Sequence, residues 1–398
     1  MGRLTQRVTT MQEAATLKMA RLGRELRATG VDVISLAVGE PDFDTPDFIK
    51  DAANRALAAG HTKYTPVPGI APLREAIAEK FRAENALDYE PGQIVVSTGA
   101  KQSLMNVCLA LLEEGDEAIF LAPYWVSYFE MARFAGATPV VVSADIEQDY
   151  KISADELEAA ITPRTRLIMI NSPCNPSGSM YTRSELEAFA KVILAHDDLY
   201  VVSDEIYEYI TFGEPHVSLG TIAGMADRVI TVNGFSKGFA MTGWRLGYLG
   251  APAWIAGAVG KIQGQFTSGA NAFAQHAAVD ALRGDRGASR DMCTAYQRRR
   301  DLLCALLGDI KGVQTNRPAG AFYVFPNVTE FYGRRFNNKV IDGSVDLCEL
   351  LLSEAHVALV PGAAFGDDRS IRFSGAAADD VLTEGVRRVA AVLERLES

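Results

Sequence analysis

A lysine set among small and apolar residues is the side chain of this sequence best suited to covalent chemistry. Lys237 lies in the string NGFSKGFAMTGWRLG (residues 233–247), directly after Ser236 and eight residues before Arg245. A lone lysine after a strand is usually a solvated surface residue. A lysine desolvated near another cation instead has a lowered pKa, and its neutral amine can form an imine with a carbonyl compound and transfer protons. The string therefore predicts an amine nucleophile.

An arginine inside a short apolar strand predicts an anion-binding site. Arg372 lies in SIRFS (residues 370–374) near the end of the chain. A buried guanidinium is costly without an anionic partner, and its planar fork suits a carboxylate. A carboxylate of the protein and a carboxylate of a bound ligand would both meet this need, and the sequence leaves both open.

Four further strings with chemically useful side chains follow predicted strands. A carboxylate, prolines, glycines or an aromatic ring at a strand end often serve only as caps, turns or core. In open α/β sheets, however, ligands bind at the carboxyl ends of the strands, and backbone N–H groups at a helix start can hold an anion. Three of these strings, STGAKQS (97–103), NSPCNPSG (171–178) and VVSDEIY (201–207), therefore predict one site at one sheet edge together with the string of Lys237. The fourth, PYW (123–125), follows the next predicted strand and by itself is more typical of core.

The elements that must position these residues follow an alternating strand–helix pattern. Such alternation implies right-handed crossovers and a mostly parallel sheet covered on both faces. The chain then becomes mainly helical after residue 253, with helices expected at 254–263, 272–282 and 289–307. The predicted strands of the sheet are 94–97, 117–121, 139–142, 167–171, 200–203, 229–232 and 246–249, with helices at 101–112, 127–134 and 184–194.

A second mixed segment predicts a smaller α/β domain built from both ends of the chain. We expect strands at 322–325, 357–360 and 371–373, helices at 345–354 and 380–396, and an N-terminal helix at 16–29 that joins them. The predicted division is an arm and part of the small domain at 1–45, a large domain at 46–300, and the rest of the small domain at 301–398. The fold class is thus α/β, with a large seven-stranded domain and a smaller partner.

Composition excludes several other classes of protein. The net charge is −11 with no long basic run, which argues against nucleic acid and anionic membranes as partners. Five scattered cysteines and five histidines supply neither a disulfide framework nor a zinc site, so we expect no metal. No G-x-G-x-x-G string follows a first strand, and no phosphate-binding P-loop string is present. No signal peptide or apolar span is visible, which predicts a cytoplasmic protein without an added DNA-binding domain.

The strings resemble, in order and spacing, those of class I aminotransferases that depend on pyridoxal 5'-phosphate (PLP) and have the type I fold. The resemblance runs from about residue 15 to the C-terminus and is closest to bacterial aspartate aminotransferases. It implies that Lys237 holds PLP as a Schiff base and later acts as a general base. It implies also that Asp204 keeps the pyridine nitrogen protonated, that Asn175 and Tyr207 bind the phenolate oxygen, and that Trp125 stacks on the ring.

The same resemblance implies where the phosphate and the substrate bind. The substrate carboxylate would bind Arg372, with Gly39, Trp125 and Asn175 beside the substrate. Tyr64 would reach the phosphate of a neighbouring subunit, which predicts a homodimer with a shared active site. The residues implied for the phosphate within the same chain are Gly99, Ala100, Lys101, Ser236 and Arg245.

The expected reaction is transamination of L-aspartate and 2-oxoglutarate to oxaloacetate and L-glutamate. Glutamate/aspartate–prephenate or aromatic transamination is the alternative, and PLP lyases and synthases share the scaffold. The residue that binds the substrate side chain stays open, with Lys18 and the stretch 263–271 as candidates.

Overall fold

The computed structural model describes residues 4–11 and 13–397, and its largest element is a seven-stranded sheet. The strand order is β2-β8-β7-β6-β5-β3-β4, and only β8 runs antiparallel to its neighbours. All seven predicted strands are confirmed to within two residues. Their bounds are β2 (Ile94–Ser97), β3 (Glu117–Ala122), β4 (Thr138–Ser143), β5 (Thr165–Asn171), β6 (Tyr200–Asp204), β7 (Val229–Gly234) and β8 (Gly247–Gly250).

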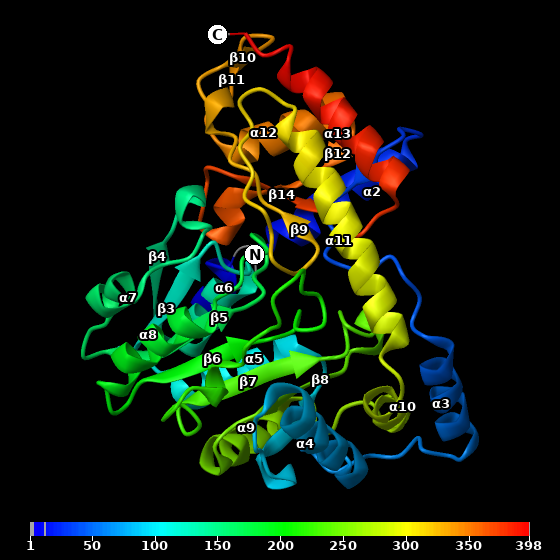
Figure 1. Ribbon diagram of the computed structural model, residues 1–398, viewed down its shortest axis with the longest axis vertical. Coiled ribbons are helices and arrows are strands. Elements are labelled where there is room, and N and C mark those ends of the chain that lie inside the picture. Colours follow the sequence, from blue (N-terminus) through cyan, green and yellow to red (C-terminus); the bar gives the residue numbers. More distant parts are fainter. Residues whose placement is uncertain (1–3, 12, 398) are drawn as a thin grey trace.

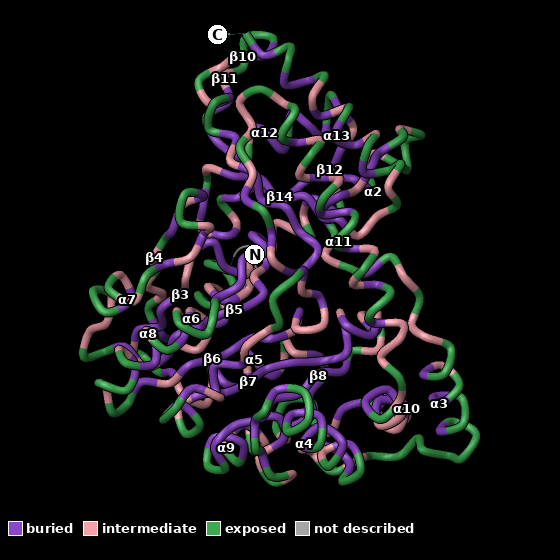
Figure 2. Tube along the Cα trace, viewed as in Figure 1, coloured by how far each residue is buried: buried purple, intermediate pink, exposed green. Residues whose placement is uncertain are grey.

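Helices cover both faces of this sheet, as nearly continuous apolar strands require. One face packs on α5 (Ala100–Leu111), α6 (Ser127–Ala135) and α9 (Ala253–Phe266). Alternate side chains of each strand point to the opposite face. That face packs on two separate groups of helices. These are α7 (Ala154–Ala160) and α8 (Arg183–Leu194) at one end, and α3 (Asp47–Ala58), α4 (Ala71–Asn85) and α10 (Ala272–Arg283) at the other. Figure 2 shows the central strands as a buried layer between helices that are exposed on their outer sides, whereas the edge strand β4 is only partly buried.

A second core joins the two ends of the chain. Met19 and Leu36 from the N-terminal part pack in one cluster with Leu303 and Val389. In Figure 1, α2 (Ala15–Ala28) and α13 (Asp379–Leu393) accordingly lie in the same half of the molecule, and both contact the segment Val357–Ala358. The strands are short: β1 (Ile34–Ser35) pairs in parallel with β12 (Val357–Ala358), and β14 (Ile371–Ser374) lies between β13 (Val360–Pro361) and β9 (Tyr323–Val324).

The remaining elements complete this second body. The helix α11 (Gly287–Gly308) runs without a break through residue 300, where the large domain was expected to end; the domain boundaries themselves stay a prediction. The expected helix at 345–354 consists of α12 (Ser344–Leu350) and a π-turn at Leu351–Ala355. A hairpin of β10 (Arg335–Phe336) and β11 (Lys339–Val340) and the short helix α1 (Gln6–Thr9) were not predicted. Among the described residues, no helix has the length and apolar content needed to cross a membrane.

Candidate active site

Four strands deliver their carboxyl ends to one edge of the large sheet. Asn171, the last residue of β5, lies opposite Asp204, the last residue of β6, and its amide Nδ2 donates to the Asp204 carbonyl at 2.9 Å. Gly247 pairs with both Gly234 at the end of β7 and Ser97 at the end of β2. The strings singled out in the sequence after β2, β5, β6 and β7 therefore meet, as predicted.

Asp204 is a buried carboxylate whose hydrogen-bond donors are neutral. The hydroxyl of Tyr128 donates to its Oδ2 at 2.6 Å, and the backbone N–H of Ile206 donates to Oδ1 at 3.3 Å. Burial raises the pKa of Asp204 to about 6, although the Tyr128 hydrogen bond pulls it down. The group is thus ionised at pH 7 and able to hold a cationic partner.

Lys237 is a partly buried lysine whose amine lies close enough to this carboxylate to feel its charge. Its Nζ donates to the carbonyl of Gly39 and lies 5.9 Å from the centre of the Phe322 ring. Burial lowers the pKa of Lys237 to about 8, and the charges of Arg372 and Arg245 act in the same direction. At neutral pH an appreciable fraction of this amine is therefore available as a nucleophile or base.

Arg372 is the most deeply buried cation of the site, and its partners are neutral. Its guanidinium donates to Asn175 Oδ1 at 2.9 Å and to the Ala37 carbonyl at 2.6 Å, while its Nε has no partner in the structure. The backbone N–H of Asn175 donates to Asn171 Oδ1 at 2.7 Å, so that the Asn171 side chain fixes the backbone of Asn175. Of the two alternatives left open by the sequence, a protein carboxylate is not the partner among the residues that the structure describes. Arg372 is thus ready to bind a ligand anion.

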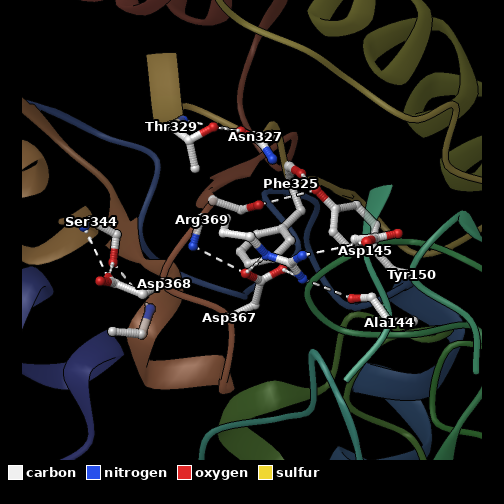
Figure 3. A network of polar contacts seen from close by, with 12 residues as sticks. Ala144, Asp145, Tyr150, Phe325, Asn327, Thr329, Ser344, Asp367, Asp368 and Arg369 are labelled. Carbon is white, nitrogen blue, oxygen red and sulfur yellow. Dashed lines mark hydrogen bonds and ion pairs between the residues drawn. The ribbon is translucent and has the colours of Figure 1, made fainter. Parts of the chain in front are cut away.

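A polar network anchors the strand that carries Arg372 (Figure 3). Arg369 donates to Asp367 at 2.8 Å and, across to the large sheet, to the carbonyl of Ala144 at 3.0 Å. The Tyr150 hydroxyl donates to the Phe325 carbonyl at 2.7 Å. These bonds tie the segment after β4 to the segments around β9 and β14, so that Arg372 is held at a fixed place above the sheet edge.

The start of α5 forms an anion cradle together with the loop before β8. A Cβ added at Gly99 would lie 2.4 Å from Arg245 Nη2, and one added at Gly247 would lie 2.2 Å from the Ala100 nitrogen. Lys101 lies 4.9 Å from the centre of the Trp125 ring. Burial and then the nearby Arg245 lower the pKa of Lys101. Because no carboxylate of the described residues neutralises these two cations, the cradle fits an anion such as a phosphate.

Two tyrosines and a tryptophan close the site. The hydroxyls of Tyr207 and Tyr323 lie 2.8 Å apart, and both side chains are buried. The Trp125 ring packs edge-on against Tyr128 with centroids 5.5 Å apart. A planar aromatic ligand would therefore find a carboxylate, a hydroxyl and an indole around the amine of Lys237.

Known proteins match this chain over nearly its full length. Residues 31–389 match the family "Aminotransferase class I and II". The chain belongs to this family. The family uses PLP as its cofactor, and the present chain is a PLP-dependent aminotransferase.

Relatives of this aminotransferase match it over nearly its full length. It is 46% identical to the bifunctional aspartate aminotransferase and glutamate/aspartate-prephenate aminotransferase of Petunia hybrida, over 97% of this chain and 82% of the relative. It is 45% identical to the aspartate/prephenate aminotransferase of Cereibacter sphaeroides, over 98% of each. The crystal structure of the aspartate aminotransferase from Rhizobium meliloti superimposes with a TM-score of 0.96 at 40% identity, covering all of both chains. The predicted type I fold is thereby confirmed.

Some predicted site residues of the aminotransferase do not meet the others within one chain. Tyr64 is 99% exposed and points away from the chain's own core. Lys18, a candidate for the substrate side chain, forms an exposed ion pair with Glu349 at 3.6 Å. Gln263 is buried, and its side chain bonds Ser97 at 2.7 Å and the carbonyl of Val96 at 2.8 Å. The first residue of the stretch 263–271 therefore serves the sheet rather than a ligand.

Two residues of the site were missed by reasoning from sequence. Tyr128, which bonds Asp204, lies only three residues after Trp125, but nothing in the string shows that its hydroxyl turns inward. Tyr323 lies in β9, next to the strand of Arg372. A strand beside a buried arginine was a signal that could have directed attention to Tyr323.

Proposed function

We propose that this chain binds PLP at the edge described above and catalyses transamination of L-aspartate and 2-oxoglutarate to oxaloacetate and L-glutamate. The observation that carries the proposal is the partly buried amine of Lys237, which lies near the buried carboxylate of Asp204 and the buried Arg372, both with neutral partners only. An amine of lowered pKa between an acid and an anion site is the arrangement that a covalent amine catalyst needs.

The residues present fit PLP in each of its parts. Lys237 would hold the cofactor covalently through its Nζ, and Asp204 would face the ring nitrogen. Asn175 has its Oδ1 occupied by Arg372, which leaves its Nδ2 to donate, together with the hydroxyl of Tyr207, to the ring oxygen. Trp125 would pack on the ring face. The cradle residues would take the phosphate: Gly99, Ala100, Lys101, Ser236 and Arg245.

The mechanism follows from what these side chains can do. Bound PLP supplies a carbonyl carbon for the donor's amine and a ring that takes up the electrons released at the donor's Cα. Arg372 binds the donor's α-carboxylate, and the carbonyl of Gly39 lies beside the amine of Lys237. Lys237, as a free amine, would remove the Cα proton of the donor, which its lowered pKa favours. Asp204 stays ionised above pH 6 and stabilises positive charge at the ring nitrogen.

The donor and acceptor are proposed from the relatives. Aspartate is in the names of both relatives above, and prephenate is in the names of both as well. Transamination between glutamate or aspartate and prephenate is therefore the second candidate, and both reactions use the same Arg372 for the α-carboxylate. Transamination of aromatic amino acids stays the third.

We propose further that two chains form the working enzyme in the cytoplasm. Tyr64 is a large side chain left almost fully exposed, at the start of a segment that packs on the same sheet edge: Gln263 donates to the carbonyl of Val67 at 2.9 Å. A tyrosine in that place can reach the phosphate cradle of a second chain. The variant Tyr64→Ala tests this against the wild type by sedimentation and by the rate at which PLP is lost. We expect the variant to lose PLP faster while the mass of the assembly in solution stays the same.

The variant Lys237→Ala tests the cofactor and the mechanism together. The wild-type protein reconstituted with PLP should absorb visible light and lose that band when an amino donor is added. Lys237→Ala should lose the lysine-bound band and at least ~10³-fold in turnover, since one group anchors the cofactor and moves the proton. Lys261→Ala, which removes an exposed lysine of α9, is the matched control. A wild-type band that persists unchanged in Lys237→Ala would disprove the proposal.

Stopped-flow mixing of the PLP form with single donors tests the substrate. Aspartate, glutamate, tyrosine and arogenate are compared by the rate at which the band decays. We expect aspartate and glutamate to react fastest. A strong preference for tyrosine, with little response to aspartate, would replace the proposed donor and leave the cofactor assignment standing.

A further inference from the structure

Tyr323 lies where the two halves of the proposed site meet. Its hydroxyl is 2.8 Å from that of Tyr207, the residue proposed for the cofactor's ring oxygen. Its ring centre is 4.5 Å from the guanidinium carbon of Arg372, the residue proposed for the substrate carboxylate. Tyr323 is 1% exposed, so both contacts are made away from water.

The backbone holds Tyr323 in this place. In β9 it pairs with Ser374 of β14, and its neighbour Val324 pairs with Phe373, so that it lies one strand away from Arg372. Gly39 makes room for it, because a Cβ at position 39 would lie 2.3 Å from the Tyr323 hydroxyl. The carbonyl of the same Gly39 accepts the hydrogen bond of Lys237. One small residue therefore borders both the amine and the tyrosine pair.

Counting protons gives the Tyr207–Tyr323 bond a direction. A phenol has one O–H to donate and can accept through its lone pairs. If Tyr207 gives its only proton to the ring oxygen of PLP, the proton between the two hydroxyls must come from Tyr323. A hydrogen bond received at its oxygen polarises the O–H of Tyr207 and strengthens its own donation, as in other hydrogen-bond chains at low dielectric.

We propose that Tyr323 is a positioning residue that links both binding arms of the site: its hydroxyl donates to Tyr207, and its ring supports the guanidinium of Arg372. The inference rests on the proposed function, since it assigns Tyr207 to the cofactor. It predicts that the hydroxyl and the ring act separately. The hydroxyl sets how strongly Tyr207 donates, and the ring sets how well Arg372 is placed for a carboxylate.

Charged groups around the pair come from several elements. Arg372 of β14 and Asp204 of β6 face Tyr207, and Arg372 faces Tyr323. Lys237, with Glu40, Arg245 and Arg372 around it, completes the surroundings. None of these groups is altered when the Tyr323 hydroxyl alone is removed, so Tyr323→Phe isolates that hydroxyl.

The first experiment titrates the visible band of the PLP-loaded protein with pH. Tyr323→Phe should raise the apparent pKa of the lysine-bound cofactor by about 0.5–1 unit, because a weaker donor stabilises the anionic ring oxygen less. Tyr296→Phe is the control, since that buried tyrosine has a hydroxyl without a partner in the structure. Gly39→Ala, which crowds the Tyr323 hydroxyl, should shift the band in the same direction as Tyr323→Phe.

The second experiment separates the ring from the hydroxyl. Tyr323→Phe keeps the ring and should leave the KM for aspartate within about twofold, whereas Tyr323→Leu should raise it by about tenfold through loss of the cation–π contact and of packing. In a Tyr207→Phe background, the effect of Tyr323→Phe on the band should vanish.

The outcomes distinguish this inference from the proposed function. A wild-type protein without a pH-dependent band would contradict the cofactor assignment itself. A wild-type band that titrates normally, with Tyr323→Phe and Gly39→Ala at the wild-type pKa, would overturn the role of Tyr323 alone. A shift that persists in the Tyr207→Phe background would likewise show that Tyr323 does not act through Tyr207.

Discussion

Two groups of charged side chains lie on opposite sides of the carboxyl end of β6. They differ in the hydrogen-bond and ion-pair partners that the protein supplies to them. The site cluster consists of Asp204, Lys237 and Arg372, whose hydrogen-bond partners are neutral. The structural network begins one residue later, at Glu205, which points to the other face of the sheet. Its members are Lys80, Asn85, Ser203, Glu205, Glu208, His216 and Ser218.

The structural network neutralises its charges internally. Glu205 accepts hydrogen bonds from Ser203 at 2.8 Å and Ser218 at 2.6 Å and lies 3.0 Å from His216 Nε2. Burial alone would raise the pKa of Glu205, but His216 and the two hydroxyls outweigh it, and the pKa is lowered. Lys80 in turn forms an ion pair with Glu208, with side chains only 1% and 5% exposed.

Two carboxylates that are adjacent in sequence, at the end of β6 and just after it, thus have opposite shifts: the pKa of Asp204 is raised and that of Glu205 is lowered. A buried charge that the protein satisfies contributes to a stable fold, whereas a buried charge that it leaves short of partners is kept for a ligand. Burial by itself does not mark a functional group, whereas the hydrogen-bond and ion-pair partners that a buried group has or lacks do mark it.

The two buried lysines give the largest expected contrast. Lys80→Met should lower the free energy of unfolding by about 3–5 kcal/mol, because it leaves Glu208 buried and unpaired. Lys237→Met should instead stabilise the PLP-free protein at pH 7 by up to about 3 kcal/mol, because it removes a cation whose pKa burial has lowered from 10.5 to about 8. Urea unfolding of the PLP-free proteins measures both. Equal destabilisation by both substitutions would refute the contrast.

Asp204 should give the PLP-free protein a distinct dependence on pH. Its pKa is about 6 in the folded state and 3.8 in the reference state, so the folded protein binds more protons between these values. Stability should therefore fall as pH rises from about 4 to 6, by roughly 3 kcal/mol from this group. The difference in unfolding free energy between wild type and Asp204→Asn, followed from pH 4 to 7, isolates this contribution. A flat difference would contradict it.

Removing one hydroxyl of the structural network should have a smaller effect. Ser203→Ala takes away a hydrogen bond to the Glu205 carboxylate and should lower the free energy of unfolding by about 1.5–3 kcal/mol. Ser103→Ala is the matched control, because the Ser103 hydroxyl is equally buried and has no partner in the structure. The two midpoints in urea should differ clearly, and a larger loss in Ser103→Ala would be the opposite of this expectation.

The smallest change in stability is expected for Arg372→Met. Removing a buried charge that has no anionic partner should stabilise the fold. Leaving the acceptor oxygens of Asn175 and Ala37 without a donor should destabilise it, and the two contributions to the free energy of unfolding should cancel to within about 1 kcal/mol. Binding of aspartate to the PLP form should nevertheless weaken by ~100-fold or more. Arg299→Met, which breaks a bidentate pair with Asp42, should show the reverse: a clear loss of stability.

Much of the fold could be predicted because its strands are buried on both faces. The run 167–170 is apolar throughout, and β5 begins only two residues earlier, at Thr165. The strand order and the reversed direction of β8 could not be predicted, since pairing depends on contacts that no local pattern encodes. The helices α3 and α4 were missed, and the expected strand at 357–360 is divided between β12 and β13.

The candidate site could be predicted where a string has fixed spacing and not where a single side chain decides. Lys237, Asp204, Asn175 and Arg372 were all named from their strings, and the structure brings them together. Tyr128 was missed because an inward hydroxyl on a helix looks, in sequence, like any aromatic core residue. The assignment of Lys101 to the phosphate stays a prediction, because its amine lies over Trp125.

The pairing of the two chain ends has a consequence for biosynthesis. Asp32 bonds Arg388, 356 residues further along, and β1 has no partner strand until β12 has been made. Synthesis proceeds at ~5–20 residues per second. The apolar side of α2 therefore leaves the ribosome many seconds before β12 and β13, the strands that pack on it. The large sheet can assemble in that interval, but α2 must wait for the late strands that it packs on. A message that stops before β12 and β13, the late strands that pack on α2, would yield a chain with this side open to proteases.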